Sequence, residues 1–301
     1  MNGRIAARLH YCDRHPFHAA GGAHLAAHRL FSPRRFGRAR ADASDFHQSG
    51  KPANRSLYFR ENRIMNDEHI VSSFDRDLAE LNQMVARLGG LAEQQFAAAI
   101  DALESRNASS IETIVSNDGE LDQLEKDLND RAIEVIATRA PMATDLRRIL
   151  SAVKIAAVLE RVGDYAKNIA KRSLVIISDE TNRSDTISVG RIADIVQGML
   201  REALDAYATA NADLAMEVWE RDQEVDELYT SLHSDLLGVI ASGSEEANVS
   251  SHFLFIAKNI ERIGDHTTAV AEQVYFQVNG EMPSDERPKA DAASGATETE
   301  A

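Results

Sequence analysis

The sequence predicts an all-α protein of six long helices, arranged as two pseudo-symmetric three-helix bundles. Between Met65 and Met282 there is a single proline, Pro141. Because proline costs about 3 kcal/mol in a helix interior, its scarcity permits long helices. Apolar residues recur at steps of three and four, the period of a helix with one buried face. Two motifs also recur about a hundred residues apart, as expected for a duplicated unit.

The N-terminal segment, residues 1–64, is expected to be a basic, disordered extension. It holds twelve Lys and Arg residues, four Asp and Glu residues and three of the six prolines, without a sustained helical period. We interpret Met65 as the natural start. Cys12, the single cysteine, excludes an intrachain disulfide and fits a reducing compartment. With His15 and His18 it suggests zinc, but no second ligand pair has zinc-finger spacing.

Six helices are expected to follow, separated by polar segments that favour turns. These segments are residues 105–109, 138–144, 179–185, 209–213 and 242–248. The helices cover residues 70–105, 108–138, 143–179, 186–209, 211–241 and 247–278. The first bundle is expected over 65–183 and the second over 184–279. The acidic tail 280–301 is polar, contains two prolines and is expected to be disordered.

The repeated motifs relate the two bundles to each other. "DGELDQL" at 118–124 matches "DQEVDEL" at 222–228 with an offset of 104 residues. "ERVGD" at 160–164 matches "ERIGD" at 261–265 with an offset of 101. The difference of three residues falls in the loop between the motifs, so the second and third helices correspond to the fifth and sixth.

The charge of the helical body excludes some functions. Residues 65–301 hold 21 basic and 44 acidic residues, a net charge of −23. Since duplex binding depends on Lys and Arg neutralising phosphates, we expect no direct nucleic-acid binding. No apolar run reaches the roughly 18 residues that a membrane span needs, so membrane contact is expected only through a partner.

Each copy of the repeat places two acidic pairs at i, i+4 spacing, which puts both members of a pair on one helix face. Like charges there repel by a few tenths of a kcal/mol, and a bound cation would remove that penalty. Mg²⁺ and Mn²⁺ prefer oxygen ligands, and iron also accepts carboxylates. The candidate metal ligands are Asp118, Asp122, Glu160 and Asp164 in the first copy, and Asp222, Asp226, Glu261 and Asp265 in the second.

The helical phase predicts that Glu160, Asp164, Glu261 and Asp265 face away from the core. At about 100° per residue, Glu160 and Asp164 lie opposite the apolar stripe of their helix, and the second copy repeats this arrangement. The stripes are Ile155, Leu159, Val162, Ala166 and Ile169, and then Ile256, Ile260, Ile263 and Val270. A solvated acidic surface without a ligand therefore stays open as an alternative.

Two further features of the motifs favour a site. Gly163 and Gly264 lie mid-helix, where glycine costs about 1 kcal/mol relative to alanine, so we expect something to approach the backbone closely there. Arg161 and Arg262 could orient carboxylates, bind an anion or form plain ion pairs within the helix.

Enzymatic chemistry has weak support. Di-iron bundles use Glu-x-x-His, which these motifs lack, and His266 faces elsewhere. A phosphate-binding loop and a dinucleotide fingerprint are also absent. The alternatives to a regulator are a carboxylate-bridged metalloenzyme of hydrolytic or oxidative type, and a purely structural helical adaptor.

Four segments of the chain form a recognisable series: "HIVSSFDRDLAEL", "RAPMATDLRRI", "LERVGDYAKNIAKR" and "NIERIGDHTTAVAEQVYF", in this order. Through them, the chain from about Met65 to Gly280 resembles the PhoU family of bacterial phosphate-uptake accessory and signalling proteins. The second copy departs from the pattern: "SGSEEANVSSHF" replaces the Pro-Met-Ala-Thr-Asp-Leu-Arg segment, and Thr/Ala chemistry replaces Asn168.

The resemblance implies PhoU-like bundles with metal clusters (Mg, Mn or Fe) on helix surfaces, held by the acidic pairs named above. Arg147 and Asn168, with Arg161 and Arg262, are candidates for supporting these sites. It also implies a cytoplasmic protein without catalytic activity, often a homodimer. Such a protein holds down phosphate-starvation signalling by linking the ATPase subunit of the phosphate ABC transporter to the phosphate-sensing histidine kinase.

Overall fold

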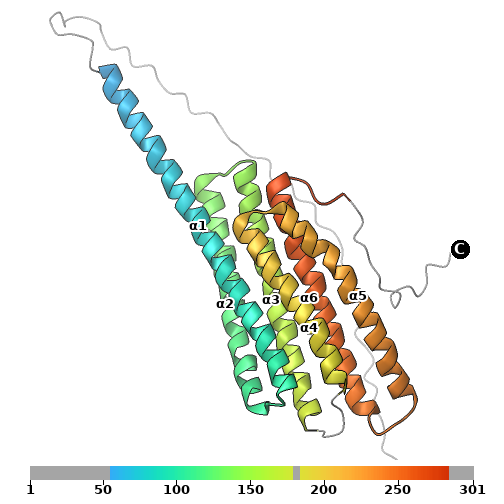
Figure 1. The fold of residues 1–301 in the computed structure, drawn as a ribbon. Coiled ribbons are helices and arrows are strands. Elements are labelled where there is room, and N and C mark those ends of the chain that lie inside the picture. The colour runs from blue at the N-terminus through green and yellow to red at the C-terminus, as the bar shows by residue number, and fades with distance from the viewer. Residues whose placement is uncertain (1–54, 179–183, 285–301) are drawn as a thin grey trace, which may run out of the picture. The chain divides into compact units, whose positions relative to one another are not determined.

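The computed structural model describes residues 55–178 and 184–284, and these form six helices without a strand (Figure 1). The predicted all-α class is confirmed. The helices are α1 (Arg55–Glu104), α2 (Ala108–Arg139), α3 (Thr144–Ile177), α4 (Ser184–Thr209), α5 (Ala212–Ala241) and α6 (Ala247–Asn279). The zinc candidates Cys12, His15 and His18 and most of the predicted tail lie outside the described residues.

The start of α1 differs from the prediction. The helix begins at Arg55 rather than near residue 70, so the expectation of no helix over residues 55–64 is wrong. No proline or glycine occurs between Pro52 and Gly89, so nothing in the backbone chemistry interrupts the helix there. Met65 lies inside α1, and its role as the natural start stays a prediction.

The α1–α2 and α4–α5 turns are two copies of one structure. Arg106 and Ala210 adopt left-handed backbone conformations, with φ of 54° and 50°. Asn107 and Asn211 follow them as N-caps. Each Asn side chain accepts a hydrogen bond from the backbone N–H two residues later, at 3.1 Å in the first copy and 3.0 Å in the second. These caps satisfy N–H groups that have no partner inside the helix.

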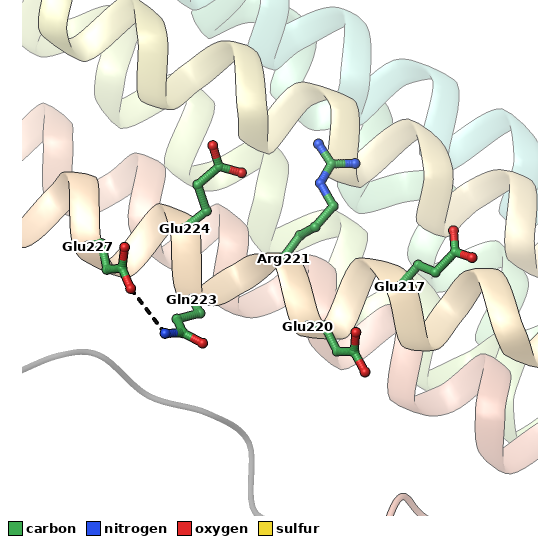
Figure 2. Close-up of a pocket in the computed structure, with 6 residues that line it drawn as sticks. All are labelled: Glu217, Glu220, Arg221, Gln223, Glu224 and Glu227. Carbon is green, nitrogen blue, oxygen red and sulfur yellow. Dashed lines mark hydrogen bonds between the residues drawn. The ribbon is translucent and has the colours of Figure 1, made fainter.

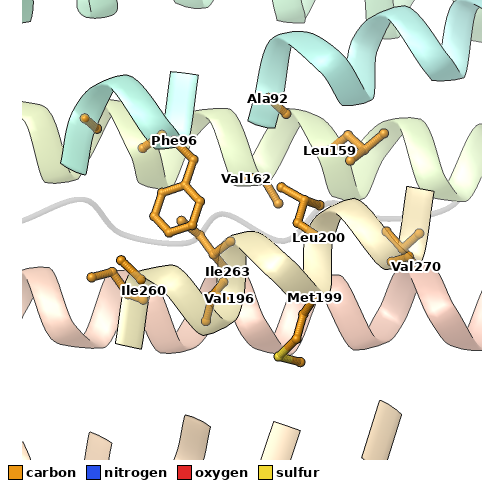
Figure 3. Close-up of a cluster of buried hydrophobic side chains, with 14 of the residues drawn as sticks. Ala92, Phe96, Leu159, Val162, Val196, Met199, Leu200, Ile260, Ile263 and Val270 are labelled. Carbon is orange, nitrogen blue, oxygen red and sulfur yellow. The ribbon is translucent and has the colours of Figure 1, made fainter. Parts of the chain in front are cut away.

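The central helices are α3 and α6. α3 packs against α1, α2 and α6, while α6 packs against α3, α4 and α5; α1 also contacts α4. Phe96 of α1, Val162 of α3, Met199 of α4 and Ile263 of α6 are fully buried together (Figure 3). The hydrophobic core is therefore continuous across the two predicted bundles. The bundle bounds at 65–183 and 184–279 stay predictions.

The apolar stripes predicted for α3 and α6 are confirmed. All nine of their residues are fully buried, as the helical period requires.

Within the described residues, no helix has both the length and the apolar composition needed to cross a membrane.

The close approach expected at the two motif glycines is also confirmed. A Cβ added at Gly163 would overlap the Cδ1 atom of Leu121 from α2. A Cβ at Gly264 would lie 3.3 Å from Asp222 Oδ1 and 3.5 Å from Val225 Cγ1, both on α5. The glycines therefore let α2 approach α3 and let α5 approach α6 at the acidic motifs.

Alanine at Gly163 should lower stability, whereas alanine at Gly90 should raise it. Overpacking against the buried Leu121 side chain costs about 1–3 kcal/mol. Most of this range exceeds the gain in helix propensity of about 1 kcal/mol. Gly90 is exposed in mid-α1 with no atom within 4 Å of an added Cβ, so only the propensity gain applies there. Thermal unfolding of both variants tests this; a Gly163→Ala protein as stable as Gly90→Ala would contradict a tight α2–α3 contact.

Candidate metal centre

The acidic pairs of the second copy lie in the contact between α5 and α6. Asp222, Asp226 and Glu261 are buried, with exposed fractions of 1%, 3% and 5%. The prediction that Glu261 faces away from the core is wrong. The helical period shows only which side of a helix faces a single core. Three helices, α3, α4 and α5, pack around α6, so its polar side is covered as well. Asp265, the fourth member, is partly buried.

The environment of Glu261, above all its burial, opposes ionisation of the carboxyl group. Burial raises the pKa of Glu261 above its ordinary value of 4.5. Lys258, whose Nζ donates a hydrogen bond to Glu261 Oε1 at 2.8 Å, lowers the pKa, while Asp265 and Asp226 raise it. Glu261 Oε2 is buried and accepts no hydrogen bond within the described part of the chain. One buried carboxylate oxygen therefore lacks compensation.

The acids of the first copy, between α2 and α3, keep more contact with water. Asp122 is exposed and Glu160 is half-buried. Asp164 is 45% exposed and forms an ion pair with Lys167. The side chain of Asp118 lies outside the part of the chain that the structure describes.

Glu160 nevertheless lies close to several other negative charges. Burial raises its pKa, and the charges of Asp164, Asp122 and Glu125 raise it further, while Arg161 lowers it. Glu125 was not predicted as a site residue. Its position three residues after Asp122, on the same face of α2, was the available signal.

The acidic groups supply the right atoms for a hard metal ion but do not converge on one point. Among the described residues, no three Asp, Glu, His or Cys side chains are arranged to hold a metal. The oxygen donors, the uncompensated Glu261 Oε2 atom and the mutual repulsion at Glu160 and Glu261 fit a cation. Binding would require the carboxylates to move toward it.

The four predicted supporting residues occupy different places. Arg147 lies near the start of α3, and its Nη1 atom would be 2.8 Å from a Cβ added at Gly280, just after α6. It is thirteen residues, or about 20 Å of helix, from Glu160. The exposed Arg161 acts on Glu160, as above. Asn168 and Arg262 line a cavity between α3 and α6 instead.

Equivalent positions of the two copies meet where α3 contacts α6. Tyr165 and His266, which are 101 residues apart, stack with ring centroids 5.4 Å apart and an angle of 21° between ring planes. Tyr165 Oη lies 3.4 Å from His266 Nε2. Burial lowers the pKa of His266, and the positive charge of Arg161 lowers it further. His266 thus faces the other copy of the repeat. This packing is consistent with the expectation that His266 faces away from the acidic pairs of its own copy.

A second acidic set on α5 is a solvated surface. Glu217, Glu220, Glu224 and Glu227 are all exposed, and Gln223 Nε2 donates to Glu227 at 3.0 Å (Figure 2). These residues alternate along α5 with the buried acids of the repeat. The same helix therefore carries one acidic face in water and another inside the α5–α6 contact.

The fold and its two acidic helix pairs define an all-α bundle protein with two related halves. A profile of the family described as PhoU domain matches residues 85–173 and 189–274. The two matches start 104 residues apart and end 101 residues apart, the same offsets that separate the repeated motifs. The chain belongs to the PhoU family.

Individual relatives agree with this assignment. The phosphate-specific transport system accessory protein PhoU homolog of Caulobacter vibrioides is 42% identical over 227 residues, which cover 75% of this chain and 99% of the relative. The homolog of Rhizobium meliloti is 40% identical over 230 residues, covering 76% and 97%. The crystal structure of PhoU from Pseudomonas aeruginosa has a TM-score of 0.67 and 30% identity, covering 69% of this chain and 100% of that one.

Glu261→Gln should stabilise the metal-free protein at neutral pH. A carboxyl group whose pKa is raised by folding holds its proton more tightly in the folded state, so its destabilising effect appears as pH rises above the ordinary value of 4.5. The variant should therefore unfold at a higher temperature than the parent at pH 7 in chelator, and this difference should vanish below pH 4.5.

Glu220→Gln, on the exposed face of α5, is the matched control and should change stability by less than about 0.5 kcal/mol. A Glu261→Gln protein less stable than the parent at pH 7 would show that the carboxylate is well compensated.

Proposed function

We propose that this chain regulates phosphate transport and phosphate-starvation signalling, and that its two acidic helix pairs bind metal ions. The observation that carries the metal proposal is the burial of Asp222, Asp226 and Glu261 in one helix contact. Buried charge is costly unless it is compensated. Lys258 supplies one positive charge to Glu261, and Asp226 and Asp265 add negative charge around the same carboxylate.

In the proposed arrangement, each metal site draws ligands from two helices. The ligands proposed for the first site are Asp118 and Asp122 from α2 and Glu160 and Asp164 from α3. Those proposed for the second site are Asp222 and Asp226 from α5 and Glu261 and Asp265 from α6. A bound Mg, Mn or Fe ion supplies positive charge that neutralises the acids. The carboxylates then hold α2 against α3 and α5 against α6, which fixes the surface that partners meet.

The names of the relatives support a role beside a transporter rather than as an enzyme. They are called accessory proteins of a phosphate-specific transport system. We infer that this chain likewise acts without catalytic turnover, in the cytoplasm and as a homodimer. Its inferred partners are the ATPase subunit of the phosphate ABC transporter and the phosphate-sensing histidine kinase.

Removing acids from one copy should remove the metal of that copy alone. The full chain, purified without chelator, is compared by elemental analysis with Glu160→Gln/Asp164→Asn and with Glu261→Gln/Asp265→Asn. Each double variant should lose about half of the bound metal, because the two acidic pairs lie in separate helix contacts.

Glu220→Gln/Glu224→Gln is the matched control, since it removes an i, i+4 acidic pair from the exposed face of α5. Unchanged metal content in both site variants, or an equal loss in the control, would contradict the proposed sites.

Metal should also be needed for partner binding. The purified ATPase subunit and the cytoplasmic part of the kinase are each titrated with the full chain, before and after metal removal. If metal fixes the partner surface, affinity should fall about ten-fold or more on removal, the size of a typical coupling free energy. Equal affinity without metal would favour a structural adaptor, and redox turnover of a small substrate would favour a metalloenzyme.

A further inference from the structure

A cavity of about 520 Å³ lies between α3 and α6, and none of the eight candidate metal ligands lines it. Its walls come from the second half of α3 and the first half of α6, so both copies of the repeat contribute. The volume falls within the range of about 300–1,000 Å³ that is typical of small-molecule sites.

The cavity is positively charged, although the helical body around it carries a net negative charge. Lys171, Arg172 and Arg262 line it, and no Asp or Glu does. Within the described residues, none of these three cations forms an ion pair. Nearby Lys167 and Lys258 both bind carboxylates, so acidic partners are available on the same helices. Three cations around one cavity repel one another, and an anion would remove that cost.

His252 also lines the cavity, and one of its ring nitrogens has no hydrogen-bond partner among the described residues. Its Nδ1 atom is buried and makes no hydrogen bond with any described residue. Burial lowers the pKa of His252, and the charge of Arg172 lowers it further, so the ring is neutral at neutral pH. A neutral imidazole can donate an N–H to an anion without adding to the repulsion among the cations.

One end of the cavity carries an aromatic side chain. Phe255 is 51% exposed, and the Arg172 guanidinium lies 4.2 Å from the centroid of its ring. Val175 also lines the cavity. Arg262 lies seven residues further along α6, at a distance of about 10 Å. The cavity thus offers an aromatic surface at one end and cations from there to the other.

The geometry points to a nucleoside polyphosphate as the ligand, with its phosphoryl groups on Lys171, Arg172 and Arg262 and its base against Phe255. Arg and Lys are the side chains that bind phosphoryl oxygens most strongly, through charge-assisted hydrogen bonds. An exposed aromatic ring stacks on any base. A single phosphate ion would leave the aromatic end empty. This inference does not depend on the metal sites or on the regulatory role.

The test is titration calorimetry of the full chain in chelator with ATP, tripolyphosphate and inorganic phosphate. Chelator keeps magnesium-bound nucleotide away from the acidic pairs, so the result is separate from the metal proposal. ATP should bind about ten-fold more tightly than tripolyphosphate, because the base contributes stacking. Inorganic phosphate should bind more weakly than either. Equal affinity for ATP and tripolyphosphate would overturn the contact between the base and Phe255.

The variants locate the site. Lys171→Glu/Arg262→Glu should weaken ATP binding about hundred-fold, and Phe255→Ala about ten-fold, through loss of charge-assisted hydrogen bonds and of stacking. Lys154→Glu is the matched control: Lys154 is also on α3 and lies 5.7 Å from the centroid of an aromatic ring, Phe276, but it does not line the cavity. It should change the affinity less than about two-fold, as expected for a charge outside the site.

Three results would overturn the nucleotide assignment. ATP fails to bind the parent, the double variant binds as tightly as the parent, or Lys154→Glu weakens binding as much as the double variant does. If ATP fails and the double variant loses affinity for the partner proteins instead, the cavity is a protein-docking surface and the nucleotide proposal is wrong.

Discussion

The packing of α3 against α6 is the contact on which the rest of this structure depends. Each helix already packs on two helices of its own copy, so this contact covers a third side of it. The apolar stripes of both helices are fully buried as a result. The acidic motifs lie on the sides of α3 and α6 that α2 and α5 approach. The arrangement that joins the two copies therefore also decides where their carboxylates lie.

One motif in two environments gives two electrostatically different sites. In the first copy Asp122 is exposed and Asp164 is 45% exposed, so water screens much of their charge. In the second copy Asp222 and Asp226 are buried, and the same charges interact in a medium of lower dielectric constant. The acids between α5 and α6 have lost more of their hydration than those between α2 and α3, so a bound cation would stabilise them more. The two halves of the proposed regulator are therefore expected to differ in metal affinity.

The sequence predicted the features that depend on local periodicity. The helix count, the buried stripes and the close approach at Gly163 and Gly264 follow from residue spacing and from the cost of glycine in a helix. The burial of Asp222 could not be predicted, because helical phase does not reveal how many neighbours a helix has. The position of Arg147 near Gly280 and the stacking of Tyr165 on His266 were missed too, since both depend on which helices pack together.

Anomalous X-ray diffraction from crystals grown with Mn²⁺ tests most directly whether each acidic helix pair holds its own metal ion. We expect two sets of anomalous peaks, one between α2 and α3 beside Glu160 and one between α5 and α6 beside Glu261. Carboxylate oxygens from both helices of a pair should lie within about 2.0–2.6 Å of the metal, as for hard cations. Peaks only at exposed acids such as those of the outer α5 face, or no ordered peaks, would contradict it.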